Sequence, residues 1–503
     1  MKKFVYISLL LFPLHLFSQE WQSQWVKQGK DGALQYIPDS DGDIIPDFSG
    51  VGYQKNRAPL PNVPTVISLR PSGNDDTEQI QQAIDKLAAM PVGKEGFRGA
   101  ILLDKGEYRI AKNVRIHTSG IVLRGRGQET KLIATGKGQR NLIYVSGQGS
   151  LQEIRDSRQR IINKRVPVGA KWIRVEDVKR LNVGDSIIVY RPATAEWIHD
   201  IQMDQIEMRD SNTVQWKPEE YSLQFERMIT KIAGDSIQLD NPIVMAMEEK
   251  YGEGEIFRYT FPGRINHVGV EDLLCISEFE SDTDEDHGWS AVFMGRVENG
   301  WVKGVTAKHF GFSCVNLGYQ SRNITVSDCT FLEAKSQITG SRRYSFNNDG
   351  QLNLVMNCYA RGGRHDYVTG ARVSGPNVFV DCKADSALAD IGPHHRWAVG
   401  TLYDNIETDG EINVQDRGNW GTGHGWAGVT QVIWNCKVKR AALQQPPVSA
   451  KNYAVGLQGA TYEGRLPGRP PALQEGQNKV GLHPDSLYRA QLNDAIKKEK
   501  NEE

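Results

Sequence analysis

Three histidines and three arginines are concentrated in one short segment, RHDYVTGARVSGPNVFVDCKADSALADIGPHHRWAVG (residues 364–400). A histidine exchanges a proton near neutral pH, and an arginine binds a carboxylate through two parallel hydrogen bonds. These groups lie on both sides of an apolar run, Val378–Val380, which is typical of a β-strand. The segment therefore predicts acid–base chemistry on an anionic ligand, at a site that strands must position.

Pairs of charged or titratable residues precede other apolar runs at a similar distance: Asp286 with His287, Arg342 with Arg343, Arg364 with His365, and Asp416 with Arg417. His394, His395 and Arg396 stand closer to the run that follows them. If the runs are strands stacked about 4.8 Å apart, residues distant in sequence become neighbours. We therefore expect one array of side chains along the stack.

A repeat supports such a stack. The segments ITVSDCTF, NLVMNCYA, VFVDCKA and VIWNCKV each place Asp or Asn and then Cys after an apolar run. The first three cysteines recur after 29 residues (358 − 329) and 24 residues (382 − 358), and LYDNIET around Asn405 fills the longer gap before Cys436. A period of this length predicts a β-solenoid, with the cysteines as a ladder inside it. Whether neighbouring cysteines form disulfides is left open.

The N-terminal third carries a family resemblance. GNDDTEQIQQAID predicts a helix within residues 71–89, and ILLDKGEYRI and SGIVLRGRGQET follow as strands. These stretches resemble the opening of the pectate-lyase-like superfamily, which includes polysaccharide lyases, polygalacturonase-like hydrolases, epimerases and phage tailspikes. The resemblance covers roughly residues 45–440. It implies an all-β, right-handed parallel β-helix with an N-terminal capping helix. We recognise no pectate lyase or polygalacturonase catalytic motif in the chain, so the resemblance indicates the fold rather than the reaction.

The chain divides into four predicted parts. Residues 1–18 read as a signal peptide, which predicts a secreted or periplasmic protein. Residues 19–62 form an extended preamble, 63–440 the β-helix with a small β insertion at about 150–262, and 441–503 a C-terminal wrapping or capping tail. The 60 basic and 61 acidic residues give no overall field for nucleic acid, and no later apolar run is long enough for membrane insertion. We expect a monomer.

The array suits an anionic polysaccharide and favours a polysaccharide lyase. β-Elimination from a uronic acid needs a cation at the carboxylate, a base for the α-proton and an acid for the leaving oxygen. The candidate catalytic residues are His365, His394, His395, Arg364 and Tyr344. The candidate substrate-binding residues are Arg342, Arg343, Arg396, Trp397, His287 and Trp289.

Two alternatives remain at this stage. A glycoside hydrolase needs two carboxyl groups across the scissile bond, for which Asp286 and Asp366 are the candidates. A non-catalytic glycan-binding solenoid would carry the same groups without turnover.

No cofactor is required by this reading, and no metal-ligating residue is assigned. Ca²⁺ is an option, because the aspartates of PDSDGDIIPD (residues 38–47) resemble a calcium loop without its downstream glutamate. The acidic run ESDTDEDHGW (residues 280–289) is a second place where Ca²⁺ would bridge to a carboxylate. Zn²⁺ at His394 and His395 would need a third ligand from another coil.

Overall fold

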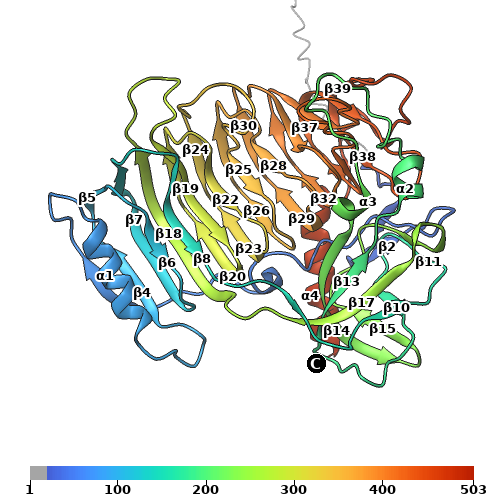
Figure 1. Cartoon of the computed structure of the whole chain (residues 1–503), viewed down its shortest axis with the longest axis horizontal. Helices are drawn as coiled ribbons and strands as arrows, with labels where there is room; N and C mark the ends of the chain where they lie inside the picture. The colour runs from blue at the N-terminus through green and yellow to red at the C-terminus, as the bar shows by residue number, and fades with distance from the viewer. Residues whose placement is uncertain (1–19, 503) are drawn as a thin grey trace, which may run out of the picture.

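The computed structural model describes residues 20–502; the predicted signal peptide lies outside this range. Most of the chain winds into successive coils whose strands pair in parallel, stacked along the long axis of the molecule from blue to orange in Figure 1. This confirms the predicted all-β fold, a parallel β-helix. Most coils give strands to three strips, and strands of neighbouring coils stack because an isolated short strand cannot bury its own apolar side chains.

The first strip contains β3 (Thr65–Leu69), β4 (Gly99–Leu103), β20 (Val297–Lys303), β23 (Arg322–Ser327), β26 (Leu354–Met356), β29 (Ser374–Val380), β32 (Ala398–Asp404), β36 (Val432–Trp434), β38 (Tyr453–Val455) and β40 (Leu473–Glu475). The second contains β5 (Gly106–Ile110), β21 (Thr306–Lys308), β24 (Thr330–Leu332), β27 (Tyr359–Arg361), β30 (Lys383–Asp385), β33 (Glu407–Thr408), β37 (Lys437–Leu443) and β39 (Gln458–Tyr462). The long strands β7 (Ile121–Ala134) and β18 (Ile265–Ser277) pair with members of both strips.

The third strip is the one that positions the site. It contains β6 (Val114–Ile116), β8 (Arg140–Ser146), β19 (Gly288–Gly295), β22 (Ser313–Leu317), β25 (Phe346–Asn348), β28 (Tyr367–Thr369), β31 (Asp390–Pro393) and β34 (Glu411–Val414). The turns before these strands carry most of the basic pairs picked out in the sequence, and His394 and His395 follow β31 directly.

The repeated cysteines lie inside the coils. All six fall within residues 20–502, and each is there a buried, free thiol. The Asp or Asn before four of them has a left-handed backbone, with φ between 51° and 55°, at Asp328, Asn357, Asp381 and Asn435. Asn and Asp tolerate this conformation better than other non-glycine residues, so the repeat marks the corner between the first and second strips. Asn405 belongs to this corner (φ 53°), which puts Ile406, not Asn405, at the cysteine position.

Helix α1 (Thr77–Ala88) lies at the N-terminal end of the stack in Figure 1. Its apolar face, Ile80, Ile84 and Leu87, is buried in the same core as the coil interiors. At the other end of the chain, α4 (Leu487–Glu502) packs with the N-terminal hairpin of β1 (Val26–Gln28) and β2 (Leu34–Tyr36) over the outer side of the first strip. The two terminal segments thereby cover that face. Among the described residues, no helix is long and apolar enough to span a membrane.

The β insertion leaves the helix after β8 and returns at β18. Its antiparallel sheet contains β9 (Gln152–Glu153), β10 (Gln159–Ile161), β12 (Trp172–Arg174), β13 (Ser186–Arg191), β14 (Leu223–Ala233), β15 (Ser236–Leu239) and β17 (Gly254–Thr260). Two short helices, α2 (Ala195–Asp200) and α3 (Pro218–Tyr221), lie between β13 and β14. In Figure 1 the insertion lies beside the later coils, far along the stack from its own attachment point.

Buried charges join the insertion to the helix. Glu226 accepts hydrogen bonds from Arg264 (2.6 and 2.8 Å), Arg322 (3.2 Å) and the Tyr259 hydroxyl (2.6 Å). Burial alone would raise the pKa of Glu226, but the two arginines hold it at about 2.

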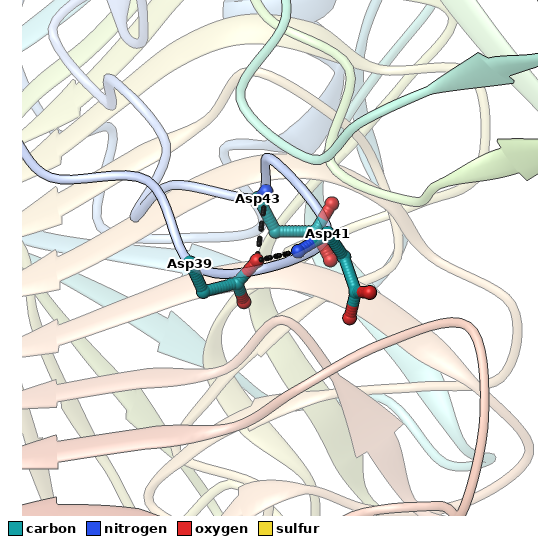
Figure 2. A group of neighbouring side chains, drawn as sticks. All are labelled: Asp39, Asp41 and Asp43. Atoms are coloured by element: carbon teal, nitrogen blue, oxygen red, sulfur yellow. Dashed lines mark hydrogen bonds between the residues drawn. The ribbon is translucent and has the colours of Figure 1, made fainter.

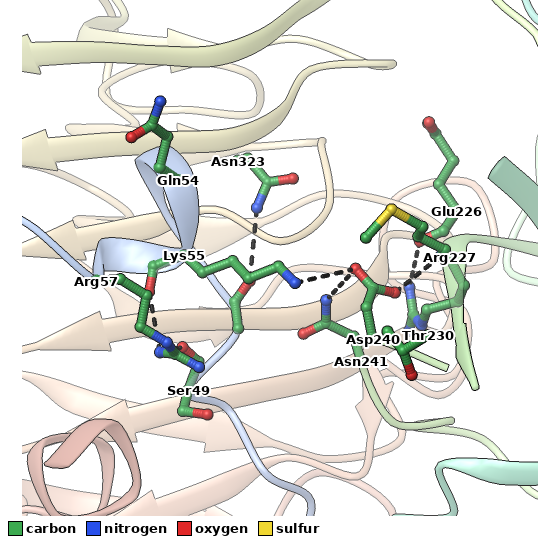
Figure 3. A network of polar contacts seen from close by, with 12 residues as sticks. Ser49, Gln54, Lys55, Arg57, Glu226, Arg227, Thr230, Asp240, Asn241 and Asn323 are labelled. Atoms are coloured by element: carbon green, nitrogen blue, oxygen red, sulfur yellow. Dashed lines mark hydrogen bonds and ion pairs between the residues drawn. The ribbon is translucent and has the colours of Figure 1, made fainter. Parts of the chain in front are cut away.

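The N-terminal segment meets this junction. Figure 3 shows Lys55 beside Asp240 of the insertion (Nζ to Oδ2, 3.9 Å) and the Asn323 amide of the helix reaching the same segment, at the Gly52 carbonyl (3.2 Å). Three parts of the chain are therefore fixed against one another here.

Candidate active site

A cavity of about 850 Å³ opens where the turns around β28, β31 and β34 meet. Three of the predicted catalytic residues line it: Arg364, His365 and His394. The remaining walls come from later turns and from β37 and include Asp390, Asp409, Glu411, Arg417, Trp420, His424, Lys439 and Arg440. The cavity thus gathers groups that lie far apart in the sequence.

His365 is fixed in one tautomer. Its Nδ1 lies 2.7 Å from the backbone carbonyl oxygen of Asp390, which can only accept a hydrogen bond, so Nδ1 carries the proton. The lone pair is then on Nε2, for which no residue between 20 and 502 supplies a hydrogen-bond partner. The Asp390 carboxylate lies 3.5 Å from Nδ1 and is itself paired with Arg417. His365 is therefore oriented as a proton acceptor, beside a carboxylate that would stabilise its cation.

Tyr344 and His394 form a second pair. The Tyr344 hydroxyl lies 3.1 Å from His394 Nε2, and the tyrosine ring is 4.9 Å from the His365 ring between centroids. Burial raises the pKa of Tyr344, and the neighbouring Arg364 opposes that shift. The phenol is therefore protonated at neutral pH and can donate a proton next to His365.

Four histidine rings form one cluster. His394 lies 4.5 Å from His365, 5.1 Å from His395 and 5.2 Å from His424, and His395 lies 4.9 Å from His424, all between ring centroids. Burial and the nearby arginines lower the pKa of His365 and His424 to about 4 and that of His395 to about 3; burial lowers that of His394 too. All four rings are neutral at pH 7. Within the described chain, Nδ1 of His394, His395 and His424 also lacks a hydrogen-bond partner.

The charges around the cavity favour an anion. Its lining includes four cationic side chains, Arg364, Arg417, Lys439 and Arg440. Its carboxylates are already engaged: Asp390 with Arg417, Glu411 with Arg440, and Asp409 with the backbone N–H groups of Ser386 and Ala387. One terminal nitrogen of Arg364, Nη1, is buried without an acceptor in the described part of the chain. A ligand carboxylate would supply it.

The structure brings together all five predicted catalytic residues. His365, His394 and Arg364 line the cavity, Tyr344 contacts two of these rings, and His395 packs on His394 from behind. By contrast, none of the predicted substrate-binding residues lines the cavity.

None of the predicted binding arginines lines the cavity. Arg342 is bound by both carboxylate oxygens of Glu285 (2.6 and 2.8 Å). Arg343 donates to the Ser336 carbonyl, and Arg396 donates to the Thr422 carbonyl (3.1 Å). The structure thus places these three arginines outside the cavity lining, against partners in neighbouring loops that the sequence pattern does not reveal.

The other predicted binding residues also lie outside the cavity lining. His287 is buried between the Ser277 hydroxyl (2.8 Å) and the Lys335 carbonyl (2.8 Å). Trp397 is 0% exposed and packs in the core of the insertion, 4.9 Å from Trp197 between ring centroids. Trp289 is half-buried against Phe312, away from the cavity. None of these three side chains lines the cavity.

The cavity residues that were not among the predicted site residues include Arg417, Trp420 and His424. They belong to the glycine-rich stretch DRGNWGTGHGW (residues 416–426), which lacks the strand periodicity that guided the search. The available signal was a histidine, an arginine and two tryptophans among four closely spaced glycines.

The paired carboxyl groups proposed for a hydrolase do not meet at the cavity. Asp366 is 1% exposed, accepts a hydrogen bond from the Ser345 hydroxyl, and has its pKa raised by burial to about 7. Asp286 is exposed and accepts the Gly138 N–H (2.8 Å). Neither residue lines the cavity.

The candidate calcium loop binds a protein cation. Asp39, Asp41 and Asp43 lie together in Figure 2, and across residues 20–502 they form the one group of three acidic, histidine or cysteine ligands whose donor atoms all lie within 4.8 Å of one another. The Lys451 ammonium group pairs with Asp39 and Asp41 (2.7 Å to Asp41), and Arg165 binds Asp43 (2.8 Å).

The four histidines of the cluster do not form a group of three whose donor atoms all lie within 4.8 Å of one another. In the second acidic run, Glu280, Asp282 and Glu285 pair with Lys137, Lys335 and Arg342.

The chain matches no family model, and no curated protein matches it. Among solved structures it is similar to the tailspike protein gp49 from Pseudomonas phage LKA1 (14% identity over 80% of this chain and 74% of that one, TM-score 0.35). It is also similar to an alginate lyase from Paenibacillus sp. strain FPU-7 (9%, 82% and 99%, TM-score 0.36). A third is a variant tailspike protein of E. coli bacteriophage HK620 in complex with a pentasaccharide (10%, 78% and 57%, TM-score 0.40). At these identities and TM-scores, the similarities carry no information about the site of this chain.

Proposed function

We propose that this protein is a secreted polysaccharide lyase of the pectate-lyase-like superfamily, cleaving a uronic-acid-containing polysaccharide by β-elimination. The observation that carries the proposal is the position of His365. It is a neutral imidazole in a fixed tautomer, and its Nε2 has no partner in the described chain. The same cavity is lined by Arg364, whose Nη1 also has no acceptor there. A proton acceptor beside a carboxylate-binding group is what removal of an α-proton requires.

The reaction would divide among five side chains. Arg364 binds the uronate carboxylate and stabilises the negative charge that develops when the adjacent C–H bond breaks. His365 Nε2 accepts that proton, and the Asp390 carboxylate stabilises the resulting imidazolium. The electron pair of the C–H bond forms the new C=C bond, the C–O bond to the next sugar breaks, and Tyr344 donates its proton to the leaving oxygen. Loss of the proton from the His365 imidazolium and uptake of one from solvent by the Tyr344 phenolate then restore both groups, with the Tyr344 oxygen held 3.1 Å from His394 Nε2.

Trp420 is the candidate surface for a sugar ring. It is 38% exposed at the cavity, and the guanidinium groups of Arg417 and Arg465 lie 5.7 and 5.0 Å from its ring centroid. These contacts hold the indole in place without covering it. Because aromatic packing contributes about 1 kcal/mol, Trp420→Ala is expected to raise KM about fivefold. Steady-state kinetics would show this with kcat and the melting temperature nearly unchanged; an unaltered KM would remove Trp420 from substrate binding.

The pH dependence should reflect the buried histidines. A base must be neutral, so kcat/KM rises with pH through the pKa of His365, which burial and the arginines lower to about 4. We expect kcat/KM to remain on its plateau through the ordinary histidine range, about pH 6.5, and to fall only as the pH approaches about 4. On the alkaline side, it should fall only above the usual tyrosine pKa of about 10, because burial raises the pKa of Tyr344. An acidic limb centred on an unperturbed histidine pKa would place the base elsewhere.

The proposal is tested by incubating the purified protein with a panel of uronic-acid polymers. A lyase produces an unsaturated sugar, detected by its ultraviolet absorbance, whereas a hydrolase produces reducing ends without that absorbance. A glycan-binding solenoid would produce neither, while still retaining polymer in a pull-down assay.

A further inference from the structure

His424 belongs to a glycine-rich loop whose conformation depends on contacts with other parts of the protein. This His424 loop, residues 418–426, connects β34 to β35 (Gly428–Val429). Its four glycines, at 418, 421, 423 and 425, all have positive φ, between 51° and 86°. Such backbone is accessible to glycine at no steric cost, but it loses much conformational entropy when ordered. The loop needs external support to hold a side chain in the cavity.

The insertion provides hydrogen bonds to the loop backbone. Between α2 and α3, the insertion sends out an arm, residues 201–216. The Val214 N–H donates to the Thr422 carbonyl (3.1 Å), the Trp216 indole N–H to the Gly423 carbonyl (3.3 Å), and the Arg209 guanidinium to the Gly421 carbonyl (2.9 Å). In the reverse direction, the Trp426 indole N–H donates to the Ile201 carbonyl (3.0 Å). The arm therefore binds three successive carbonyl groups just before His424, at residues 421–423, and accepts one hydrogen bond from Trp426, just after it.

The arm also fills the space against the loop. A Cβ atom at Gly425 would lie 2.6 Å from the Trp216 ring, so the indole packs directly on the backbone next to His424. Trp216 is itself held by stacking on Tyr221, at 4.0 Å between ring centroids. The indole therefore cannot move away from the loop without disturbing the insertion core.

Two tryptophans of the helix complete this support. Trp426 and Trp397 are fully buried in the core of the insertion rather than in the interior of the coils. Each stands two residues after a histidine of the cluster, His424 and His395 respectively. The same short segments thus anchor a tryptophan in the insertion and leave a histidine in the cluster at the cavity.

We infer that the insertion is part of the catalytic unit: its arm, through Trp216 and Val214, positions His424 in the cavity. Trp216 is a positioning residue, since it contacts the loop and not the cavity. The inference rests on the proposed function only where activity is the readout. The loop geometry stands independently of it.

The test is a double-mutant cycle between Trp216 and His424. Trp216→Phe keeps an aromatic ring but removes the N–H that binds the Gly423 carbonyl. His424 lines the cavity with its ring 5.2 Å from that of His394, so its displacement should disturb the Tyr344–His394 pair, and we expect kcat to fall about tenfold with KM little changed. In the His424→Ala background, the same substitution should have no further effect, because the group it positions is gone. Trp172→Phe is the matched control, since Trp172 is 43% exposed on the same insertion, and it should leave kcat unchanged.

A second readout does not depend on turnover. The groups that face His424 are Arg417 from its own loop segment, Arg209 from the insertion, and His365, His394, His395 and Arg396 from the coils. Loosening the loop would expose the imidazole to water and move its pKa from about 4 toward the ordinary value of about 6.5. NMR titration of ¹³C-labelled histidine would follow this in Trp216→Phe, and in Val214→Pro, which removes the N–H bound to the Thr422 carbonyl at an exposed position without changing any charge.

The outcomes separate the two proposals. An upward shift of the His424 titration in both variants, in a protein without lyase activity, supports the positioning role and sinks the proposed function. Equal losses of kcat from Trp216→Phe in the wild-type and His424→Ala backgrounds, or an unshifted His424 titration, would overturn the positioning role alone.

Discussion

Replacing His365 with asparagine is expected to lower kcat on a uronic-acid polymer by about 10²–10⁴-fold, the usual contribution of a general base. The asparagine amide can still donate to the Asp390 carbonyl, so the buried hydrogen bond that fixes the side chain is kept. What is lost is Nε2, a buried atom with no partner in the described chain, on a residue that lines the cavity. The substrate should still bind, and KM should change little.

Two controls make that result specific. Tyr344→Phe should also lower kcat strongly, because it removes the acid while leaving the ring contacts with His365 and His394 in place. His287→Asn is the matched negative control, since His287 is as buried as His365 but bonds only to structural groups away from the cavity. A His365→Asn enzyme within a few-fold of the wild-type rate would exclude His365 as the base.

The second large effect is on stability. Arg417 and Asp390 form an ion pair in which the residues are 2% and 7% exposed. Arg417→Met would leave a buried carboxylate without its cation, which typically costs about 3–5 kcal/mol in the free energy of unfolding. Chemical denaturation at neutral pH would measure this loss. The double variant Arg417→Met with Asp390→Asn should recover much of it, because no charge then remains buried.

The pH dependence of the stability that the Arg417–Asp390 pair contributes is a further check. Although burial opposes it, Arg417 lowers the pKa of Asp390 in the folded protein, so the pair stabilises the fold above the unfolded-state pKa of about 3.9. Without Arg417, burial would raise the folded pKa above the unfolded one. The variant should then lose stability as pH rises through that range, the opposite of the wild-type contribution. Equal stability of Arg417→Met and wild type across pH would show that the pair is not a significant interaction.

The coils could be predicted from the sequence because burial inside a solenoid repeats with the chain. The Asp or Asn before each cysteine marks a corner that needs left-handed backbone, and the cysteine after it is a small interior side chain. The same regularity placed Tyr344 and His365 on neighbouring coils, so their proximity followed from the register. In the segment around Asn405, Ile406 takes the position that the cysteine holds in the other coils.

The rest depends on parts of the chain that the repeat does not describe. Trp397 looks like a sugar-binding surface beside His395 and Arg396, but the insertion returns to cover it from more than a hundred residues away in sequence. Arg342 looks available until an acidic loop supplies Glu285. His424 stands in a loop shaped by glycines and by contacts with the insertion, so no local pattern marks it.

The central claim is that the cavity at His365 removes a proton from a bound uronate. The most direct measurement is the ultraviolet absorbance of the products formed from a panel of uronic-acid polymers by the wild-type protein and by His365→Asn. We predict an unsaturated product from at least one polymer with the wild-type protein, and its near-complete loss in the variant. Reducing ends without that absorbance, or unsaturated product formed equally by both proteins, would contradict the account.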